Sequence, residues 1–350
     1  MKVNYEKRYS LIIEEVYRRK FDAFLVTQSG NLRYLTSPQI PFFPIVKYIV
    51  LPRKREPIVF FHKLEVNRVR DMCPISDQRM LPDVVDEDKW KSALKKNLSR
   101  LGLEKILCDG KMEFEGFIFE KSDFVNDLRS RKDDYEINLI MKSAKIASKA
   151  VKFLEDNVLA EGVTEMEVAN EVDHYMRSIG AQATSFHTIV ASGLNSSYPH
   201  HHPTMKKLRK GETVICDLGA VYEGYCSDLT RTFLLGNPSS KLTEIYDAVY
   251  EAQMEAIKAV KANTEARSIE LAAREVLSSY GLEKYFIHSI GHGIGLEIHE
   301  KPIISKDSEE AIRDGNVFTV EPGVYVKGVG GVRIEDDLIV KGGVKVLTGH

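Results

Sequence analysis

The sequence has little of what is typical of secreted, membrane-spanning or nucleic-acid-binding proteins. Its four cysteines (73, 108, 216 and 226) are scattered and form no CxxC pair, which argues against a zinc ribbon or a disulfide framework. No apolar run reaches the roughly 20 residues of a membrane-spanning helix, and the first 20 residues lack the apolar core of a signal peptide. The formal net charge of −2 gives no electrostatic reason to expect binding to nucleic acid or to an anionic membrane. We therefore expect a cytoplasmic protein whose cysteines are small buried hydrophobic residues.

The length of 350 residues favours two domains. Strand-like apolar segments alternate with helical ones in the first part of the chain, which predicts an α/β domain over residues 1–130. The expected helices are 5–20 and 87–101, and the expected strands are 22–28, 47–52, 56–63 and 104–110. The charged segment SRKDDYE (130–136) is predicted to be a linker.

After residue 136 the pattern changes to that of an α+β domain, expected over residues 131–350. Apolar residues first recur at helical spacing, and Thr164 with Glu167 three residues later forms a capping-box pattern that predicts the start of another helix. Further helical stretches are expected at 239–261 and 266–280. The short strands and turns around them predict a curved antiparallel sheet.

Four carboxylates lie within apolar, strand-like segments of this second domain. Asp217 in VICDLG and Asp228 in YCSDLTRT are expected on two strands joined by a turn, and Glu321 in VFTVEPGVY and Glu335 in GGVRIEDDLIV on another such pair. An unpaired charge is costly to bury among apolar neighbours, and a cation is the partner that would make its burial tolerable. Together with one histidine, these carboxylates supply five ligands, enough for two divalent ions that share bridging oxygens.

Each of these residues also has an ordinary structural explanation. A single aspartate in a strand is more often an edge residue, a turn former or a partner of arginine, and a single histidine in a glycine-rich turn is more often structural. GHGIGLEIHE (291–300) carries His292 and His299 but lacks the βαβ context of a dinucleotide site. HEKPI does not match HExxH, and ASGLN does not match GxSxG. Chance is, however, a poor explanation for the joint pattern of acids and histidines.

A series of motifs resembles that of the pita-bread metallopeptidases, and most of all the Xaa-Pro dipeptidases (prolidases) and Xaa-Pro aminopeptidases. The motifs are TIVASGLNSSYPHHHPT, VICDLGAVYEGYCSDLTRTFLLG, FIHSIGHGIGLEIHEKP, VFTVEPGVY and GGVRIEDDL, which span roughly residues 135–345 in unbroken order. The N-terminal half, with DAFLVTQSGNLRYLTS, is similar to the creatinase-type N-terminal domain of that branch. The resemblance implies a pita-bread (creatinase/aminopeptidase) catalytic domain over 131–350.

The resemblance also implies a dinuclear metal centre in each subunit. Its ligands would be Asp217, Asp228, His292, Glu321 and Glu335, with Asp228 and Glu335 bridging the two ions. Four carboxylates and one histidine favour Mn²⁺ by ligand hardness, with Co²⁺ or Zn²⁺ as possible replacements.

The catalytic groups follow from the same resemblance. His200 and His299 would face the substrate and hold the scissile carbonyl oxygen, and Glu321 would accept a proton from the attacking water and hand it to the leaving nitrogen. Tyr325 and Arg333 would orient the ligands and relay protons. The implied reaction is hydrolysis of the Xaa-Pro bond in short peptides, and the implied assembly is a homodimer through the N-terminal half, with the loop Pro38–Pro44 near the partner's site.

Some positions depart from the prolidase pattern. Related prolidases carry an arginine shortly after the second histidine, where it can pair with the carboxylate of a dipeptide. Here the segment reads HEKPIIS, with Lys301 and Ile303, and no arginine appears before Arg313. An Xaa-Pro aminopeptidase that accepts longer peptides therefore stays open as an alternative. His201 and His202 are interpreted as residues of the loop surface.

Other proteins with this fold are weaker alternatives. A creatine-type amidinohydrolase lacks the complete ligand set, and a non-catalytic binding protein typically loses ligands, whereas all five are present here. A methionine aminopeptidase would not have the N-terminal domain or the PHH segment.

Overall fold

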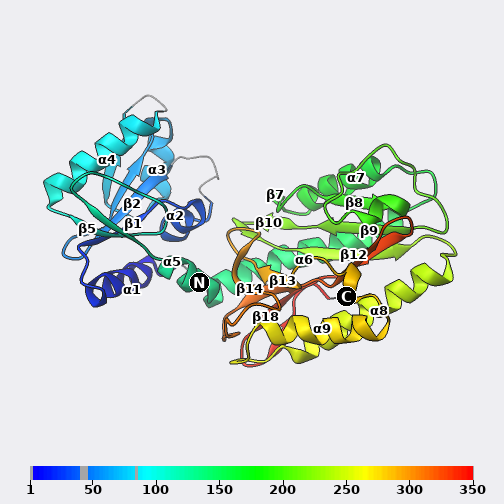
Figure 1. Ribbon diagram of the computed structural model, residues 1–350. Helices are drawn as coiled ribbons and strands as arrows, with labels where there is room; N and C mark the ends of the chain where they lie inside the picture. The colour runs from blue at the N-terminus through cyan, green and yellow to red at the C-terminus, as the bar shows by residue number, and fades with distance from the viewer. Residues whose placement is uncertain (1–2, 40–45, 83–85, 350) are drawn as a thin grey trace. The chain divides into compact units, whose positions relative to one another are not determined.

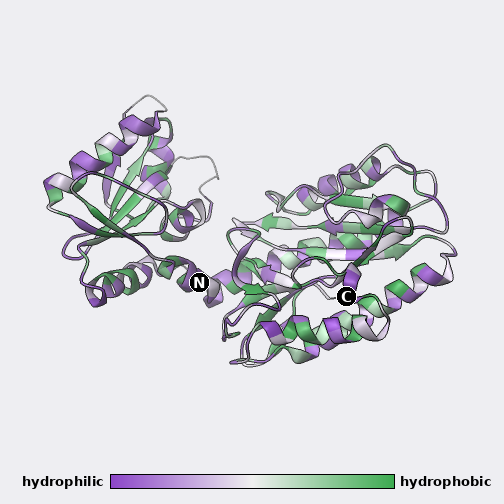
Figure 2. Ribbon diagram, in the orientation of Figure 1, coloured by the Kyte–Doolittle hydropathy of each residue, from purple (hydrophilic) through white to green (hydrophobic). Residues whose placement is uncertain are grey.

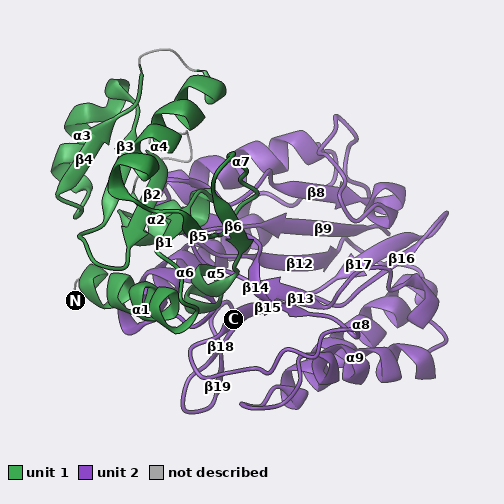
Figure 3. Ribbon diagram, turned by 60° about the vertical axis from the view of Figure 1, so that its left-hand side comes forward, with its two compact units in different colours: residues 1–129 green, residues 130–350 purple. Residues whose placement is uncertain are grey.

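The computed structural model describes residues 3–39, 46–82 and 86–349. The chain divides into two compact units, Met1–Arg129 and Ser130–His350, which Figure 3 shows in different colours. Among the described residues, no helix combines the length and the apolar character needed to cross a bilayer.

A six-stranded mixed sheet forms the centre of the first unit, in the order β4-β3-β2-β1-β5-β6. Its strands are β1 (Ala23–Val26), β2 (Val46–Pro52), β3 (Ile58–Phe61), β4 (Asp77–Met80), β5 (Lys105–Cys108) and β6 (Ile118–Lys121). β2 pairs antiparallel with β1 and β3, and the remaining pairs are parallel. β1 and β3 are buried along their whole length, which explains why they are continuous apolar runs in the sequence.

Helices flank this sheet (Figure 1). They are α1 (Tyr5–Arg18), α2 (Ser29–Leu35), η1 (Lys63–Glu65, a 3-10 turn), α3 (Val66–Met72), α4 (Glu87–Leu101) and α5 (Phe124–Ser130). Trp90, Leu94 and Leu98 of α4 pack into one core with side chains of β1, β2 and β3. The predicted helices and strands are confirmed as α1, α4, β1, β2, β3 and β5. β4 and β6 were missed because, as edge strands with few buried side chains, they carry little apolar signal.

The second unit consists of two halves, each with a sheet covered by two long helices. In the first half, α6 (Asp134–Asn157) and α7 (Glu165–Ser178) pack on the sheet β12-β9-β8. The strands of this half are β7 (Ala183–Thr184), β8 (Ile189–Ser192), β9 (Thr213–Leu218), β10 (Ala220–Tyr222), β11 (Tyr225–Cys226) and β12 (Leu229–Leu234). β7, β10 and β11 form a second small sheet, in the order β11-β10-β7, and the 3-10 turn η2 (Gly193–Ser197) follows β8.

In the second half, α8 (Ser240–Ala259) and α9 (Arg267–Ser279) share a core with the sheet β14-β13-β15-β18-β19. The elements here are η3 (Glu283–Tyr285), β13 (Gly291–Gly293), β14 (Glu300–Ile304), β15 (Val317–Val320), β16 (Gly323–Val326), β17 (Gly330–Arg333), β18 (Asp336–Val340) and β19 (Val344–Val346). Figure 2 shows that α8 and α9 alternate hydrophilic and hydrophobic residues along their length, as expected of helices that cover a sheet on one face only. The predicted antiparallel strands and both helices are confirmed.

The prediction of a linker at 130–136 was wrong for most of its length. α6 begins at Asp134, where Asp133 and Glu136 form a capping box. Lys132 is buried, and its Nζ lies 3.2 Å from Oε2 of Glu300. The sequence places acids and bases side by side here, but it does not show that they are paired with distant partners inside the fold. The capping box predicted at Thr164 and Glu167 is confirmed, and all four cysteines are buried and form no disulfide within the described part of the chain.

Candidate metal centre

The four carboxylates lie on or next to strands from both halves of the second unit. Asp217 lies on β9, as expected. The other three lie in short breaks between strands: Asp228 between β11 and β12, Glu321 between β15 and β16, and Glu335 between β17 and β18. The prediction that they lie inside strands was therefore wrong. Side chains of a continuous strand stand roughly perpendicular to its sheet, and a break allows each carboxylate to turn towards a common point.

Three of the predicted ligands meet around one point. Asp228, His292 and Glu335 each offer one ligand atom, and these atoms lie within 4.8 Å of one another. Nε2 of His292 is 3.7 Å from Oδ2 of Asp228 and 3.4 Å from Oε1 of Glu321. The negative charge of Asp217 contributes to the raised pKa values of Asp228, Glu321 and Glu335, which places it beside the same group.

This crowding has a large electrostatic cost. Burial is the main reason that the pKa values of Asp228 and Glu335 lie well above their ordinary range, and neighbouring carboxylates raise them further. Burial raises the pKa of Glu321 to about 8, although the charge of Arg333 opposes the shift. A cluster of this kind is unfavourable for a folded protein unless a positive charge compensates it.

Three carboxylate oxygens of the cluster also lack a hydrogen-bond donor. Within the described part of the chain, Oδ1 of Asp217, Oδ1 of Asp228 and Oε1 of Glu335 are buried and have no hydrogen-bond partner. A buried acceptor without a donor costs about 1–3 kcal/mol. Oxygens that are buried, negatively charged and without donors are ligands that hard divalent cations prefer, so the residues present fit a divalent metal centre.

His292 has the tautomer that a metal ligand needs. Its Nδ1 lies 3.1 Å from the carbonyl oxygen of Gly293, and because a carbonyl can only accept, Nδ1 must carry the proton. Burial lowers the pKa of His292 to about 4, which keeps the ring neutral. The lone pair of Nε2 is therefore directed towards Asp228 and Glu321, and the backbone holds the ring in this orientation.

Arg333 and Thr230 connect the ligands. Nη2 of Arg333 donates to Oδ2 of Asp217 at 2.6 Å, and its Nε donates to Oγ1 of Thr230 at 3.2 Å. Oγ1 of Thr230 in turn donates to Oε2 of Glu335 at 2.6 Å. Two predicted ligands that are 118 positions apart in sequence, Asp217 and Glu335, are thus oriented through one arginine and one threonine.

Tyr325 extends this network to His288. Nη1 of Arg333 donates to the Tyr325 hydroxyl at 2.8 Å, and this hydroxyl lies 3.0 Å from Nε2 of His288. Nδ1 of His288 is 2.8 Å from the carbonyl oxygen of Ser289 and must carry its proton, so in the neutral ring Nε2 accepts from Tyr325. Burial lowers the pKa of His288 to about 4 and raises that of Tyr325 to about 12, which is consistent with neutral groups on both sides of this bond.

The two histidines expected to face a substrate lie at the exposed edge of the cluster. The ring of His299 is 4.3 Å from the ring of His292, centre to centre, and His299 is exposed. His200 is exposed as well, and its charge helps to lower the pKa of His299, although burial is the larger cause. The carbonyl oxygen of the preceding residue, Pro199, accepts from Nη1 of Arg333 at 3.2 Å.

Comparison with known proteins places this geometry in a family. The profile of metallopeptidase family M24 matches residues 138–342, more than half of the chain. The chain belongs to metallopeptidase family M24. Among related proteins, the Xaa-Pro dipeptidase of Pyrococcus horikoshii is 36% identical over 344 residues, which cover 96% of this chain and 95% of that protein. The Xaa-Pro dipeptidase of Pyrococcus furiosus is 44% identical over 264 residues, which cover 72% of this chain and 74% of that protein.

Solved structures of related proteins agree in fold. The Xaa-Pro dipeptidase from Bacillus anthracis superposes with a TM-score of 0.90 at 32% identity and covers 99% of this chain and 98% of that one. The expected α+β pita-bread fold is confirmed. Membership of the M24 family makes the chain a hydrolase and implies that it binds a divalent metal.

Three residues of this M24 site were missed or misread from the sequence. His201, interpreted as loop surface, has a side chain only 12% exposed, with Nε2 3.0 Å from Oε2 of the buried Glu165. That interpretation was wrong because a run of three histidines does not show which one turns inwards, whereas His202 is exposed as expected. Thr230 and His288 were missed. Thr230 lies two positions after the predicted ligand Asp228, and His288 lies four positions before the predicted ligand His292, so closeness in sequence to a predicted ligand was the signal that could have identified them.

Proposed function

We propose that this protein hydrolyses the Xaa-Pro bond of dipeptides with the help of two divalent ions per subunit, most favourably Mn²⁺. The observation that carries the proposal is the cluster of buried carboxylates with oxygens that lack donors, beside a neutral, oriented His292 and two exposed histidines. The names of the relatives, Xaa-Pro dipeptidases, support the choice of substrate. The proposed ligands are Asp217, Asp228, His292, Glu321 and Glu335.

When bound, the ions supply Lewis acidity that polarises the scissile carbonyl and acidifies a water molecule. The side chain of Glu321 is 17% exposed, so one of its carboxylate oxygens can accept a proton from water and return it to the leaving nitrogen. His200 and His299, both exposed beside the cluster, would hold the carbonyl oxygen as negative charge develops on it. Arg333 keeps Asp217 in place and, through Tyr325, joins His288 to the same network.

A peptide bond that precedes proline requires a site that positions the substrate through its carbonyl group. The nitrogen of an Xaa-Pro bond carries no hydrogen, so a peptidase cannot use a hydrogen bond from it to position the substrate. The histidines and the ions would have to position the carbonyl instead.

An Xaa-Pro aminopeptidase that acts on longer peptides is the second candidate. Ile303 of β14 is 54% exposed, in the segment after His299 where the prolidase pattern has an arginine. Nζ of Lys301, which could replace that arginine as a point charge, lies 3.9 Å from Oε1 of Glu310 and thus has a partner other than a substrate carboxylate.

The proposal is tested by removing metal with a chelator, reconstituting with Mn²⁺, and measuring rates on Ala-Pro, Ala-Pro-Ala, Met-Ala-Ser and creatine. We expect Ala-Pro to be cleaved fastest. Preference for Ala-Pro-Ala would favour the aminopeptidase, and failure to cleave either prolyl peptide in a metal-loaded sample would contradict both.

The homodimer and the cytoplasmic location stay predictions. Light scattering tests the first, and a purely monomeric mass would contradict it. The loop Pro38–Pro44, expected near the partner's site, lies mostly outside the described residues.

A further inference from the structure

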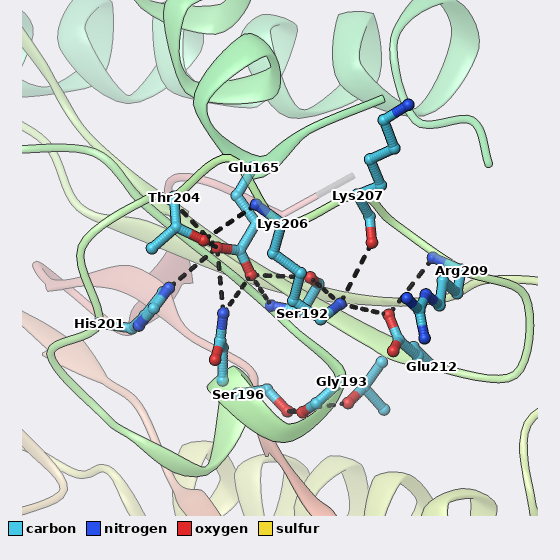
Figure 4. A network of polar contacts seen from close by, with 12 residues as sticks. Glu165, Ser192, Gly193, Ser196, His201, Thr204, Lys206, Lys207, Arg209 and Glu212 are labelled. Atoms are coloured by element: carbon cyan, nitrogen blue, oxygen red, sulfur yellow. Dashed lines mark hydrogen bonds and ion pairs between the residues drawn. The ribbon is translucent and has the colours of Figure 1, made fainter. Parts of the chain in front are cut away.

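A buried carboxylate outside the metal centre accepts several hydrogen bonds from one loop. Glu165, the first residue of α7, is fully buried. Its Oε1 accepts from the backbone N–H and hydroxyl of Ser192 at 2.8 and 2.7 Å, and its Oε2 accepts from the backbone N–H and hydroxyl of Thr204 at 3.1 and 2.7 Å. Nδ2 of Asn195 and Nε2 of His201 also reach it, both at 3.0 Å. Figure 4 shows His201 and Thr204 pointing towards this carboxylate from one side.

The backbone of α7 holds the same loop. The N–H of Glu165 donates to the carbonyl oxygen of Lys206 at 3.0 Å, and the N–H of Met166 donates to that of Thr204, also at 3.0 Å. The start of the helix therefore holds both ends of the loop segment 192–204, one at Ser192 and the other at Thr204. Water or a capping side chain normally satisfies these first helical N–H groups, whereas here the loop does.

Glu165 is held as an anion by these contacts. Burial by itself raises its pKa, but the hydrogen bonds from Thr204, His201 and Ser192 outweigh burial and lower the pKa below its ordinary value. Charge-assisted hydrogen bonds of this kind are roughly twice as strong as neutral ones. The neighbouring Glu167 has no part in this: its carboxylate accepts from the backbone and hydroxyl of Thr164, within the cap of its own helix.

The middle of the same loop segment is fixed to strand β17, which carries Arg333. The N–H of Gly331 donates to Oγ of Ser196 at 2.7 Å, and a Cβ at Gly331 would lie 2.1 Å from the carbonyl oxygen of Ser196, so only glycine allows this approach. Arg333, which binds Asp217, donates to the carbonyl oxygen of Pro199. His200 thus lies between Pro199, which is fixed to Arg333, and His201, which is fixed to Glu165.

We propose that Glu165 is a positioning residue, which fixes the loop segment 192–204 so that His200 is presented to the substrate. The inference rests on the proposed function for the role of His200. The contrasting explanation is that Glu165 only stabilises the start of α7. In that case its loss would lower the stability of the protein without a specific effect on the loop or on turnover.

The first test measures the loop itself, in the metal-loaded full-length protein. Glu165→Gln keeps the size of the side chain, but it replaces one accepting oxygen by an NH₂ group. This group would face N–H or O–H donors, to which it cannot form the wild-type hydrogen bonds. Amide hydrogen exchange across residues 192–204 is expected to accelerate by tenfold or more, while the rest of α7 and the bound metal stay as in the wild type. Glu167→Gln is the matched control, since it removes the same charge from the same helical turn, and it should leave exchange in this segment unchanged.

The second test asks whether Glu165 acts through His200. We expect Glu165→Gln to lower kcat on Ala-Pro about tenfold with little change in KM, and to cause no further loss when His200→Ala is already present. His201→Phe removes a single donor and is a milder variant should Glu165→Gln fail to fold. It should lower kcat in the same way, whereas His202→Phe should not.

The outcomes separate this inference from the proposed function. Unchanged exchange in 192–204, or equal kinetic losses with and without His200, would overturn the positioning role even in an active enzyme. If the wild type cleaves no prolyl peptide, the proposed function fails, and hydrogen exchange alone decides whether Glu165 fixes the loop.

Discussion

Replacing Glu321 by glutamine should stabilise the metal-free protein at neutral pH and leave its stability nearly unchanged in acid. The pKa of this carboxyl rises from 4.5 to about 8 in the folded protein, chiefly because it is buried. Between these two values the folded protein holds a proton that the unfolded chain has released. The free energy of unfolding therefore decreases as the pH rises through this window, and metal-free protein should be less stable at pH 7 than at pH 4.5 on account of this group.

The size of the effect follows from the same pKa values. A pH of 7 is about 2.5 units above the pKa of this carboxyl in the unfolded chain, and each unit corresponds to about 1.4 kcal/mol, so the loss is at most about 3.5 kcal/mol. Glutamine has a similar shape and no titrating group, so the variant avoids this loss. The comparison is between two pH values within each protein, which cancels any difference in packing between the two side chains.

Urea unfolding of chelator-treated protein, followed by circular dichroism at both pH values, measures this difference. Added Mn²⁺ should reverse the order of stability at pH 7, because an ion that binds only the folded wild type stabilises it by about 4.1 kcal/mol at a thousandfold excess over its Kd, which exceeds the loss caused by Glu321. Glu309→Gln, a change at an exposed position, is the matched control and should behave as the wild type. An identical pH dependence in wild type and Glu321→Gln, or equal stabilisation of both by Mn²⁺, would refute the reasoning.

Further predictions concern individual side chains of the centre. Asp228→Ala or Glu335→Ala should lose both ions, because each is proposed to bridge them; two ions retained in either variant, by elemental analysis, would contradict the assignment. His299→Ala should keep both ions while kcat falls by about 10²-fold or more, and unchanged turnover would count against its role. Thr230→Val loses the hydrogen bonds to Glu335 and Arg333 and should weaken metal binding about 10–100-fold, whereas Thr230→Ser, which keeps the hydroxyl, should not.

Much of the carboxylate cluster could be predicted from the sequence, because charged side chains within apolar segments conflict with their surroundings. A carboxylate such as Asp217 within an apolar strand calls for a partner, and the motif series supplied a consistent set of partners. The breaks between strands in which Asp228, Glu321 and Glu335 lie could not be predicted, since a gap of one or two residues between strands leaves almost no trace in hydrophobic periodicity.

The groups that support the centre were harder to predict for a physical reason. Thr230 and Glu165 act through hydrogen bonds to residues far away in the chain, and nothing local distinguishes them from an ordinary strand threonine or an acid in the first turn of a helix. Likewise, a buried ion pair such as Lys132–Glu300 resembles solvated charge until the fold brings its two members together.

The central claim is that ions held by this carboxylate cluster are required for cleavage before proline. The direct measurement is a titration of chelator-treated protein with Mn²⁺, in which bound metal and the rate of Ala-Pro hydrolysis are followed in the same samples. The account predicts no hydrolysis without metal and a rate that reaches its plateau at two ions per chain. Full activity in the metal-free sample, or a saturated centre that leaves Ala-Pro intact, would contradict it.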